Sequence, residues 1–221
     1  MSQFIINSFI EFPVSAPELV FESDYTDASD WTQTGSKVTV DSGKADWCNS
    51  ANAQTNDSLQ QVIQDMNVTL DDTEFYADWT YINATGGTVG GYPLVFQSST
   101  GNYDTASNDA IAFSESNANK VKLNSKNSGS YVVGTGEIGV TINTTYYMRL
   151  ERLSATELRL SVFTDSDRTT HATGSPVTAT NANVENITDL THVQSQNQTS
   201  GGGGGTNFEV TDLSVYNGLP E

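Results

Sequence analysis

Apolar and polar side chains alternate with a period of two through residues 146–163, and this pattern constrains the fold more than any other feature. The stretch reads YYMRLERLSATELRLSVF, with Ser154-Ala155 between its two alternating halves. A period of two places successive side chains on opposite faces of a strand, whereas a helix repeats about every 3.6 residues. The stretch therefore predicts two antiparallel strands joined by a tight turn.

Residues 146–168 also contain every arginine of a chain whose formal net charge is -18, namely Arg149, Arg152, Arg159 and Arg168. Across the predicted pair of strands Glu151 lies within reach of Arg149, Arg152 or Arg159. We interpret the group as an exposed cross-strand ladder of ion pairs that holds the hairpin in register. The arginine stems would cover neighbouring apolar surface while their charged ends stay in water.

Short alternating segments separated by Gly, Asn, Asp, Ser and Thr continue along the 221 residues, a length that suits a single all-β domain. No convincing amphipathic helix is present, and residues 58–66 are the one ambiguous segment. More than ten short strands predict two packed antiparallel sheets. The predicted strands lie near residues 18–25, 36–41, 43–48, 58–66, 73–83, 92–98, 109–115, 119–124, 130–134, 145–153, 156–164, 187–194 and 206–216.

Composition limits the partners and the sources of stability. The acidic excess argues against nucleic acid and anionic membranes as partners, and no segment approaches the length of a membrane span. Cys48 is the only cysteine, so stability must come from packing rather than from an intrachain disulfide. The run Gly201–Gly205 is followed by one further predicted strand, which favours a surface loop over an interdomain linker.

Residues 1–16 differ from the rest of the chain. They lack the basic region and the uninterrupted apolar region of a signal peptide, yet they are crowded with apolar residues. We expect an N-terminal apolar arm over residues 1–16 that docks on another subunit, followed by a domain over 17–221; packing of the arm on its own domain is the alternative. The predicted docking residues are Phe4, Ile6, Phe9, Ile10 and Phe12.

Several segments together resemble the strand order of concanavalin A-like, laminin-G-like jelly-roll domains. They are LVFESDYTDASDWT, DAIAFSES, NTTYYMRLERLSATELRLSVFTDSDR, ITDLTHV and NFEVTDLSVYNG. The resemblance implies an all-β, two-sheet antiparallel jelly-roll sandwich in which the first and last strands pair, preceded here by the extended N-terminal arm. Such domains occur in lectins, carbohydrate-binding modules, clan B glycoside hydrolases, adhesion modules and structural proteins of tailed phages.

The hydrolases of this fold carry an E-x-D-x(1,2)-E signature, because alternate residues place a nucleophile and an acid/base on one face about 5 Å apart. Glu22 and Asp24 have no third carboxylate in register, and Glu209 and Asp212 face opposite sides of a strand. The two histidines, His171 and His192, are far from each other and from Cys48, so neither a zinc site nor a histidine-based triad is supported. The sequence therefore predicts that the protein is not an enzyme.

The resemblance also implies a structural Ca²⁺ between the first-strand region and the last strand. Hard oxygen ligands are available in Glu22, Asp24 and Asp212, with Asp27 and Asp30 nearby. The alternative is that the aspartates of YTDASDW form turns and helix caps. Calcium is the one cofactor that we consider.

Aromatic residues decide the question of glycan binding. The tryptophans are expected in the core. In EFYADWTYI, residues 75, 77, 79 and 81 share one face, and the mixed opposite face of residues 76, 78, 80 and 82 can line a binding cleft. Three further tyrosines, Tyr92, Tyr103 and Tyr131, lie at turn edges, where a flat ring can stack on a sugar. The candidates for glycan binding are Tyr76, Asp78, Tyr92 and Tyr103.

These features predict a non-enzymatic structural protein of a tailed-phage virion, either a capsid decoration protein or a tail-associated subunit. The arm would anchor it to other copies of itself, as a homo-oligomer, or to a major capsid or tail protein, while the acidic sandwich faces solvent at the virion surface and binds host-surface glycans. The alternative is an extracellular carbohydrate-binding module or adhesin with structural calcium. A diverged glycoside hydrolase is a third possibility.

Overall fold

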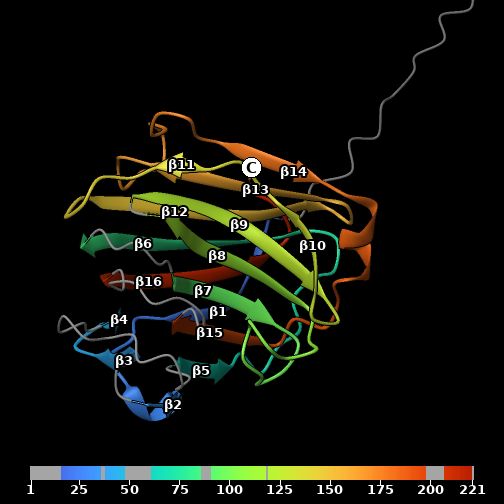
Figure 1. The fold of residues 1–221 in the computed structure, drawn as a ribbon, viewed down its shortest axis with the longest axis horizontal. Helices are drawn as coiled ribbons and strands as arrows, with labels where there is room; N and C mark the ends of the chain where they lie inside the picture. The colour runs from blue at the N-terminus through green and yellow to red at the C-terminus, as the bar shows by residue number, and fades with distance from the viewer. Residues whose placement is uncertain are drawn as a thin grey trace, which may run out of the picture.

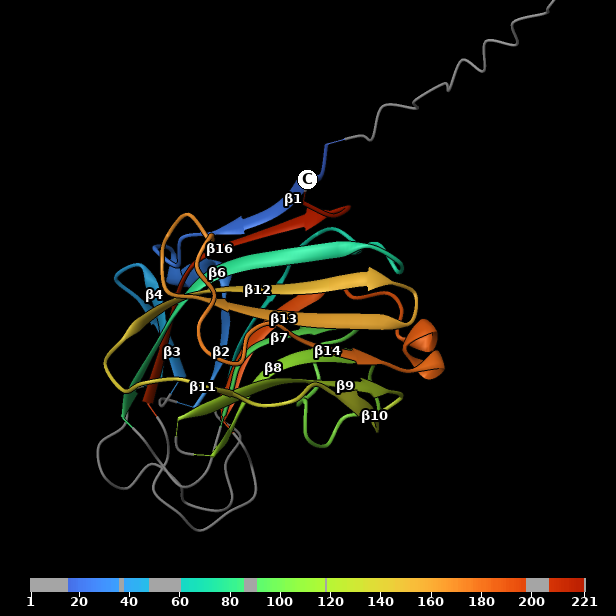
Figure 2. The same cartoon turned by 90° about the horizontal axis from the view of Figure 1, so that it is seen from above.

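The computed structural model describes residues 16–35, 38–47, 61–85, 91–117, 119–197 and 207–220. They form two antiparallel β-sheets that lie as two layers, one on the other (Figure 1; Figure 2). Within these residues no helix is long and apolar enough to cross a membrane. Three sequence predictions lie outside the described residues: the docking set Phe4, Ile6, Phe9, Ile10 and Phe12, the lone Cys48, and the loop Gly201–Gly205.

The first sheet places the predicted hairpin beside the longest strands. Its β1 also pairs with β16, so the first and last strands of the described chain are neighbours, as the resemblance implied. The strand order is β14 (Val177–Thr180), β13 (Glu157–Phe163), β12 (Thr145–Ser154), β6 (Phe75–Thr85), β16 (Asn207–Asn217), β4 (Lys44–Trp47) and β3 (Val38–Asp41), with β1 (Glu18–Ser23) beside β16.

The second sheet contains part of the segment that was ambiguous in the sequence, residues 58–66: within it Gln61–Asp65 form a strand, as predicted. Its strand order is β10 (Ser130–Gly134), β9 (Lys120–Asn127), β8 (Ala110–Asn117), β7 (Gly91–Gln97), β15 (His192–Asn197), β5 (Gln61–Asp65) and β2 (Thr32–Thr34), with β11 (Ile138–Gly139) beside β9.

The sequence prediction missed three short strands, β2, β11 and β14, because two to four residues carry too little alternation to be recognised. It also missed two 3₁₀ helices, η1 (Ala28–Asp30) and η2 (Ala182–Asn186). The predicted strand at 187–194 instead begins at His192, because η2 and an irregular segment precede it.

Aromatic side chains from both sheets meet in the core. Phe75, Trp79 and Tyr81 point inward from β6, and Phe96 and Phe113 point inward from the facing sheet. The Trp79 and Tyr81 rings each contact Phe113 edge-to-face, with centroids 5.2 and 5.1 Å apart, and Phe75 contacts Phe96 at 5.9 Å. Edge-to-face pairs add about 0.5–1.5 kcal/mol each to the stabilisation from burial. These three ring contacts fix which face of β6 points into the core.

Arg152 shows that the exposed ladder predicted for the arginines is wrong at this position. The alternation of β12 places Arg152 on the inward face with Leu150, and its side chain is fully buried. Its Nη1 donates to the Ile187 carbonyl at 2.7 Å, and its Nη2 donates to the Val184 carbonyl at 2.9 Å. Carbonyls at the end of η2 need donors inside the protein, and this guanidinium supplies them.

We predict that Arg152→Met lowers the free energy of unfolding by about 3 kcal/mol, since buried carbonyls lose charged donors while the apolar stem is kept. Urea denaturation measures the change. The matched control is Lys120→Met: Lys120 lies on β9, its side chain is 51% exposed, and its ion pair with Glu137 should contribute less than about 1 kcal/mol. Equal effects of the two substitutions would contradict a structural role for the buried arginine.

Candidate functional site

The outward face of the first sheet carries the other arginines in a fixed pattern. On β12, Arg149 is opposite Asp78 of β6 on one side and Ser161 of β13 on the other. Two residues further on, Glu151 is opposite Arg159. Because the intervening residues of these strands fill the core, the register forces all five side chains onto the outer face.

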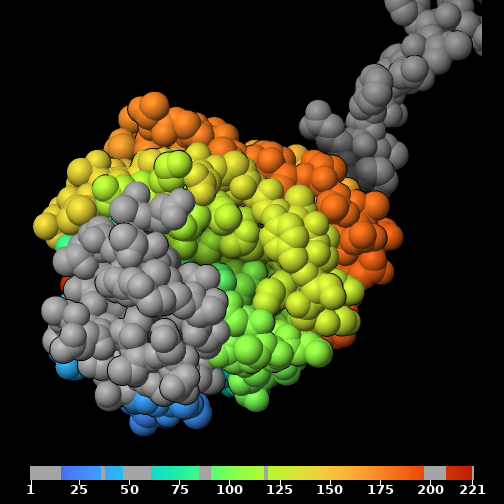
Figure 3. Space-filling view, viewed as in Figure 1, coloured from blue at the N-terminus to red at the C-terminus, as the bar shows by residue number. Residues whose placement is uncertain are grey.

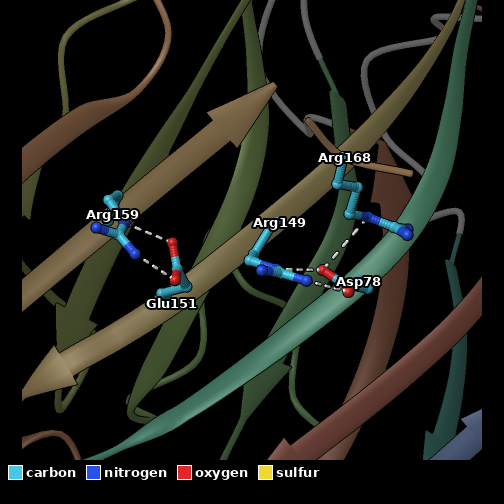
Figure 4. Close-up of polar contacts among 5 residues, drawn as sticks. All are labelled: Asp78, Arg149, Glu151, Arg159 and Arg168. Atoms are coloured by element: carbon cyan, nitrogen blue, oxygen red, sulfur yellow. Dashed lines mark hydrogen bonds and ion pairs between the residues drawn. The ribbon is translucent and has the colours of Figure 1, made fainter. Parts of the chain in front are cut away.

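Two of these arginines form bidentate pairs with carboxylates (Figure 4). Arg149 donates to both oxygens of Asp78 at 2.7 Å, from Nε and Nη2. Arg159 donates to both oxygens of Glu151 at 2.5 Å, again from Nε and Nη2. Such paired contacts are stronger and more directional than single hydrogen bonds. The cross-strand pairing of Glu151 with Arg159 is among those that the sequence predicted, but Glu151 is 1% exposed rather than solvated.

The carboxylates keep these guanidinium groups charged. The hydrogen bond to Glu151 raises the pKa of Arg159 above its ordinary value, and partial burial opposes the effect. For Arg149, burial alone would lower the pKa, but the hydrogen bond and charge of Asp78 outweigh it and the pKa is raised. Both groups are therefore fixed positive charges with defined orientations.

Arg168 approaches the same face from the loop of residues 164–176, which connects β13 to β14 (Figure 4). Its Nε lies 3.5 Å from Asp78 Oδ1, an ion-pair distance, but this buried nitrogen makes no hydrogen bond within the described residues. The guanidinium carbon lies 6.0 Å from the centre of the Tyr147 ring. Of the three arginines on this face, Arg168 makes the fewest side-chain hydrogen bonds within the described residues.

Aromatic rings flank the charged groups. Tyr76 and Tyr216 stack with their ring centres 4.5 Å apart, and the Arg149 guanidinium lies 4.9 Å above the Tyr76 ring. On the other side of the arginines, His171 stacks on Phe163 at 4.5 Å, and its Nδ1 lies 3.1 Å from Ser175 Oγ. The His171 residue is exposed, so it offers a flat surface to solvent.

A cleft of about 290 Å³ lies among these residues. We name it the arginine cleft and define it by the six lining residues that matter most here: Arg149, Glu151, Arg159, Phe163, Arg168 and His171. Most of its lining is polar. It combines oriented guanidinium donors with a flat ring, and this combination suits an oxygen-rich ligand.

The structure separates the four residues predicted to bind glycans. Tyr76 and Asp78 lie on the outward face of the first sheet, as predicted, beside the arginine cleft. Tyr92 and Tyr103 belong to the other sheet and its covering segment, 98–109; Figure 3 shows this side of the molecule. Tyr103 is 2% exposed and packs at 4.4 Å against Tyr92, and Lys126 Nζ lies 4.4 Å from the Tyr103 ring centre. Glycan binding by that pair stays a prediction.

Sequence reasoning missed Arg168, Phe163 and His171 as members of one site. The concentration of arginine in residues 146–168 was a usable signal, but the loop that carries Arg168 and His171 has no periodicity from which its path can be read. Both tryptophans with described side chains, Trp31 and Trp79, are buried, which confirms the expectation that they belong to the core.

The carboxylates proposed as calcium ligands, Glu22, Asp24 and Asp212, are not brought into a metal-binding group: among the described residues no three His, Cys, Asp or Glu side chains gather in that way. Asp24 accepts from the Thr26 amide at 3.0 Å and from the Thr26 hydroxyl at 2.7 Å, and these bonds lower the pKa of Asp24. Asp27 caps η1 through Ser29. The alternative role of these aspartates as turn formers and caps is thus observed for two of them, and calcium stays a prediction.

Asp165 shapes the loop that carries Arg168. Its carboxylate accepts from the Thr169 hydroxyl at 2.5 Å and from the Thr170 amide at 2.8 Å, and its carbonyl accepts from the Arg168 amide at 3.1 Å. The Thr169 hydroxyl and the Thr170 amide hold the pKa of Asp165 below its ordinary value. The loop is therefore held by the ionised form of this side chain.

We predict that amide protection at Thr169 and Thr170 is lost on acidification. Because the folded pKa of Asp165 is below the unfolded value of about 3.9, its contribution is complete above that pH and disappears as the pH falls through the folded pKa. Asp165→Ala should remove the protection at neutral pH, whereas Asp167→Ala in the same loop should not. Hydrogen exchange by NMR measures both, and protection that survives in Asp165→Ala would contradict this account.

Comparisons with known proteins give structural likeness only. No family model matches the chain. No curated protein matches it either. Among solved structures, the non-specific endo-β-1,3(4)-glucanase SCLam from family GH16 has a TM-score of 0.59 at 10% identity and covers 93% of each chain.

Two phage proteins are also similar in fold, with slightly lower TM-scores. The CBM2 module of the evolved Dit of Lactobacillus casei BL23 phage J-1 has a TM-score of 0.56 at 10% identity, over 91% of this chain and 96% of that one. The carbohydrate esterase vb_24B_21 of Shiga toxin-encoding bacteriophage phi24B has a TM-score of 0.54 at 10% identity, over 92% and 100%. At these identities the likeness is one of fold. The chain thus has the jelly-roll, concanavalin A-like β-sandwich that its sequence predicted.

Proposed function

We propose that the chain is a non-enzymatic, carbohydrate-binding subunit of a phage particle, displayed at the virion surface. The observation that carries this proposal is the arginine cleft, where flat rings and oriented guanidinium donors lie together while each carboxylate is held by an arginine. Such a surface favours ligand binding over a reaction that requires proton transfer.

A saccharide matches the chemistry of this face. Its hydroxyl and ring oxygens accept hydrogen bonds, and its C–H surface stacks on flat rings. The exposed His171 ring, backed by Phe163, supplies one such surface, and Arg159, whose side chain is 35% exposed, supplies donors beside it. Towards β16, Tyr216 stacks on the buried Tyr76, whose ring lies beneath the Arg149 guanidinium and supports its position.

Hydrolysis is a poorer match. A glycosidase needs one carboxylic acid that can give up its proton and a second carboxylate to act as nucleophile or base. Here both oxygens of Glu151 accept from Arg159, and both oxygens of Asp78 accept from Arg149. Each bidentate contact engages both oxygens of its carboxylate, so neither carboxylate is left free to attack a sugar or to pass a proton to it.

The assignment to a particle draws on two kinds of support. Two of the similar structures come from phages, and one of them is described as a CBM2 module. The acidic, polar composition suits a displayed surface, and the apolar segment of residues 1–16 would anchor the domain to another copy of itself or to a major capsid or tail protein. Immunogold labelling of purified particles tests this part, and labelling confined to the host cell surface would contradict it.

We predict that a glycan array detects binding, and that His171→Ala weakens it about tenfold, since a lost stacking ring costs about 1–1.5 kcal/mol. The matched control is His192→Ala, which removes the other histidine, on β15 of the opposite sheet. Equal loss in both variants would place binding elsewhere. Repeating the array with a chelator tests the calcium prediction, because binding through the arginine cleft should not change.

A further inference from the structure

Arg168 is a partly buried cation whose hydrogen-bonding capacity is not used up. Its side chain is 20% exposed, and its Nε lies among protein atoms without a hydrogen bond inside the described region. The nearest carboxylate, Asp78, already accepts two short hydrogen bonds from Arg149 and is 3.5 Å away. Asp78 therefore balances the charge of Arg168 at a distance, while the terminal nitrogens Nη1 and Nη2 make no hydrogen bond within the described residues. These two donors, beside a cleft, are available to an acceptor on a ligand.

The charges on this face are balanced, unlike those of the rest of the chain. Arg149, Arg159 and Arg168 carry three positive charges, and Asp78, Glu151 and the neighbouring Glu157 carry three negative charges, so the group is formally neutral. The chain as a whole has a formal charge of -18. A neutral face on so acidic a protein can admit one compact anionic group, whereas a long polyanion would be repelled by the remaining surface.

The two bidentate pairs also define where an anion can be bound. Arg159 uses Nε and Nη2 on Glu151, and within the described residues its Nη1 has no acceptor. Arg159 and Arg168 both line the arginine cleft, and its volume of about 290 Å³ is just below the range of small-molecule sites, about 300–1,000 Å³. The cleft therefore suits a single sugar unit with one charged group.

We infer that the arginine cleft binds a saccharide through a sugar carboxylate, as in a uronic acid, with Arg168 as the principal partner of that carboxylate. The inference rests on the proposed function and names its ligand class. The planar guanidinium fork matches the two oxygens of a carboxylate, as it does in the Arg149–Asp78 and Arg159–Glu151 pairs of the same face. The His171 ring then packs against the sugar.

Isothermal titration of the full chain with D-glucuronate, D-galacturonate and the neutral sugars D-glucose and D-galactose tests the inference. At least one uronate should bind at least ten times more tightly than its neutral counterpart. Added salt should weaken the binding of the uronate and leave that of the neutral sugar unchanged. Arg168→Gln should reduce uronate affinity to the level of the neutral sugar. Lys120→Gln makes the same change of net charge on β9 of the opposite sheet and should leave the affinity unchanged.

The outcomes that overturn the inference are distinct from those that overturn the proposed function. If neutral glycans bind and His171→Ala weakens their binding, but uronates bind no more tightly, the cleft is a glycan site and the inferred sugar carboxylate is wrong. Tighter binding of D-glucose 6-phosphate than of both uronates would also contradict the inference that the charged group of the ligand is a carboxylate. If no saccharide of either class binds, the proposed function itself fails. Unchanged thermal unfolding of Arg168→Gln excludes misfolding as the cause of a loss.

Discussion

The structure depends on the interlocking of side chains between its two sheets, above all where Trp79 and Tyr81 of β6 meet Phe113 of β8. A slip of one residue in the register of β6 would move these rings into solvent and carry Asp78 into the core. Core packing therefore decides the pairing of β6 with β12, and this pairing places Asp78 opposite Arg149. The packing of the inward, apolar face of β6 therefore determines which charged side chains lie together on its outward face.

The same arginine-rich stretch serves two purposes that alternation keeps apart. Arg152 lies on the inward face and binds the carbonyls that end η2, so it belongs to the fold. Arg149 and Arg159 lie on the outward face and are held by carboxylates of the adjacent strands. A single stretch thus supplies one guanidinium that is buried within the fold and two that are held on the outer face by carboxylates.

Most of the fold was predictable because its long strands have strong alternation. The hairpin of β12 and β13, the strand at 75–85 and the adjacency of β1 and β16 all follow from side-chain periodicity or from the resemblance. The site was only partly predictable. The outward position of Tyr76 and Asp78 follows from the alternation of β6, whereas Arg168 arrives through a loop whose path is set by hydrogen bonds to Asp165. Such bonds leave no periodic trace in a sequence.

The pairing of β1 with β16 has a consequence for how this domain can be joined to other proteins. Glu18 is the register partner of Asn217, so the chain enters and leaves the sandwich at one point of its surface. A domain with neighbouring ends can be inserted into a surface loop of a host protein without stretching the host backbone. Residues 17–220 contain every residue that lines the arginine cleft, so a carrier protein that received them between two positions of a surface loop would receive the whole cleft.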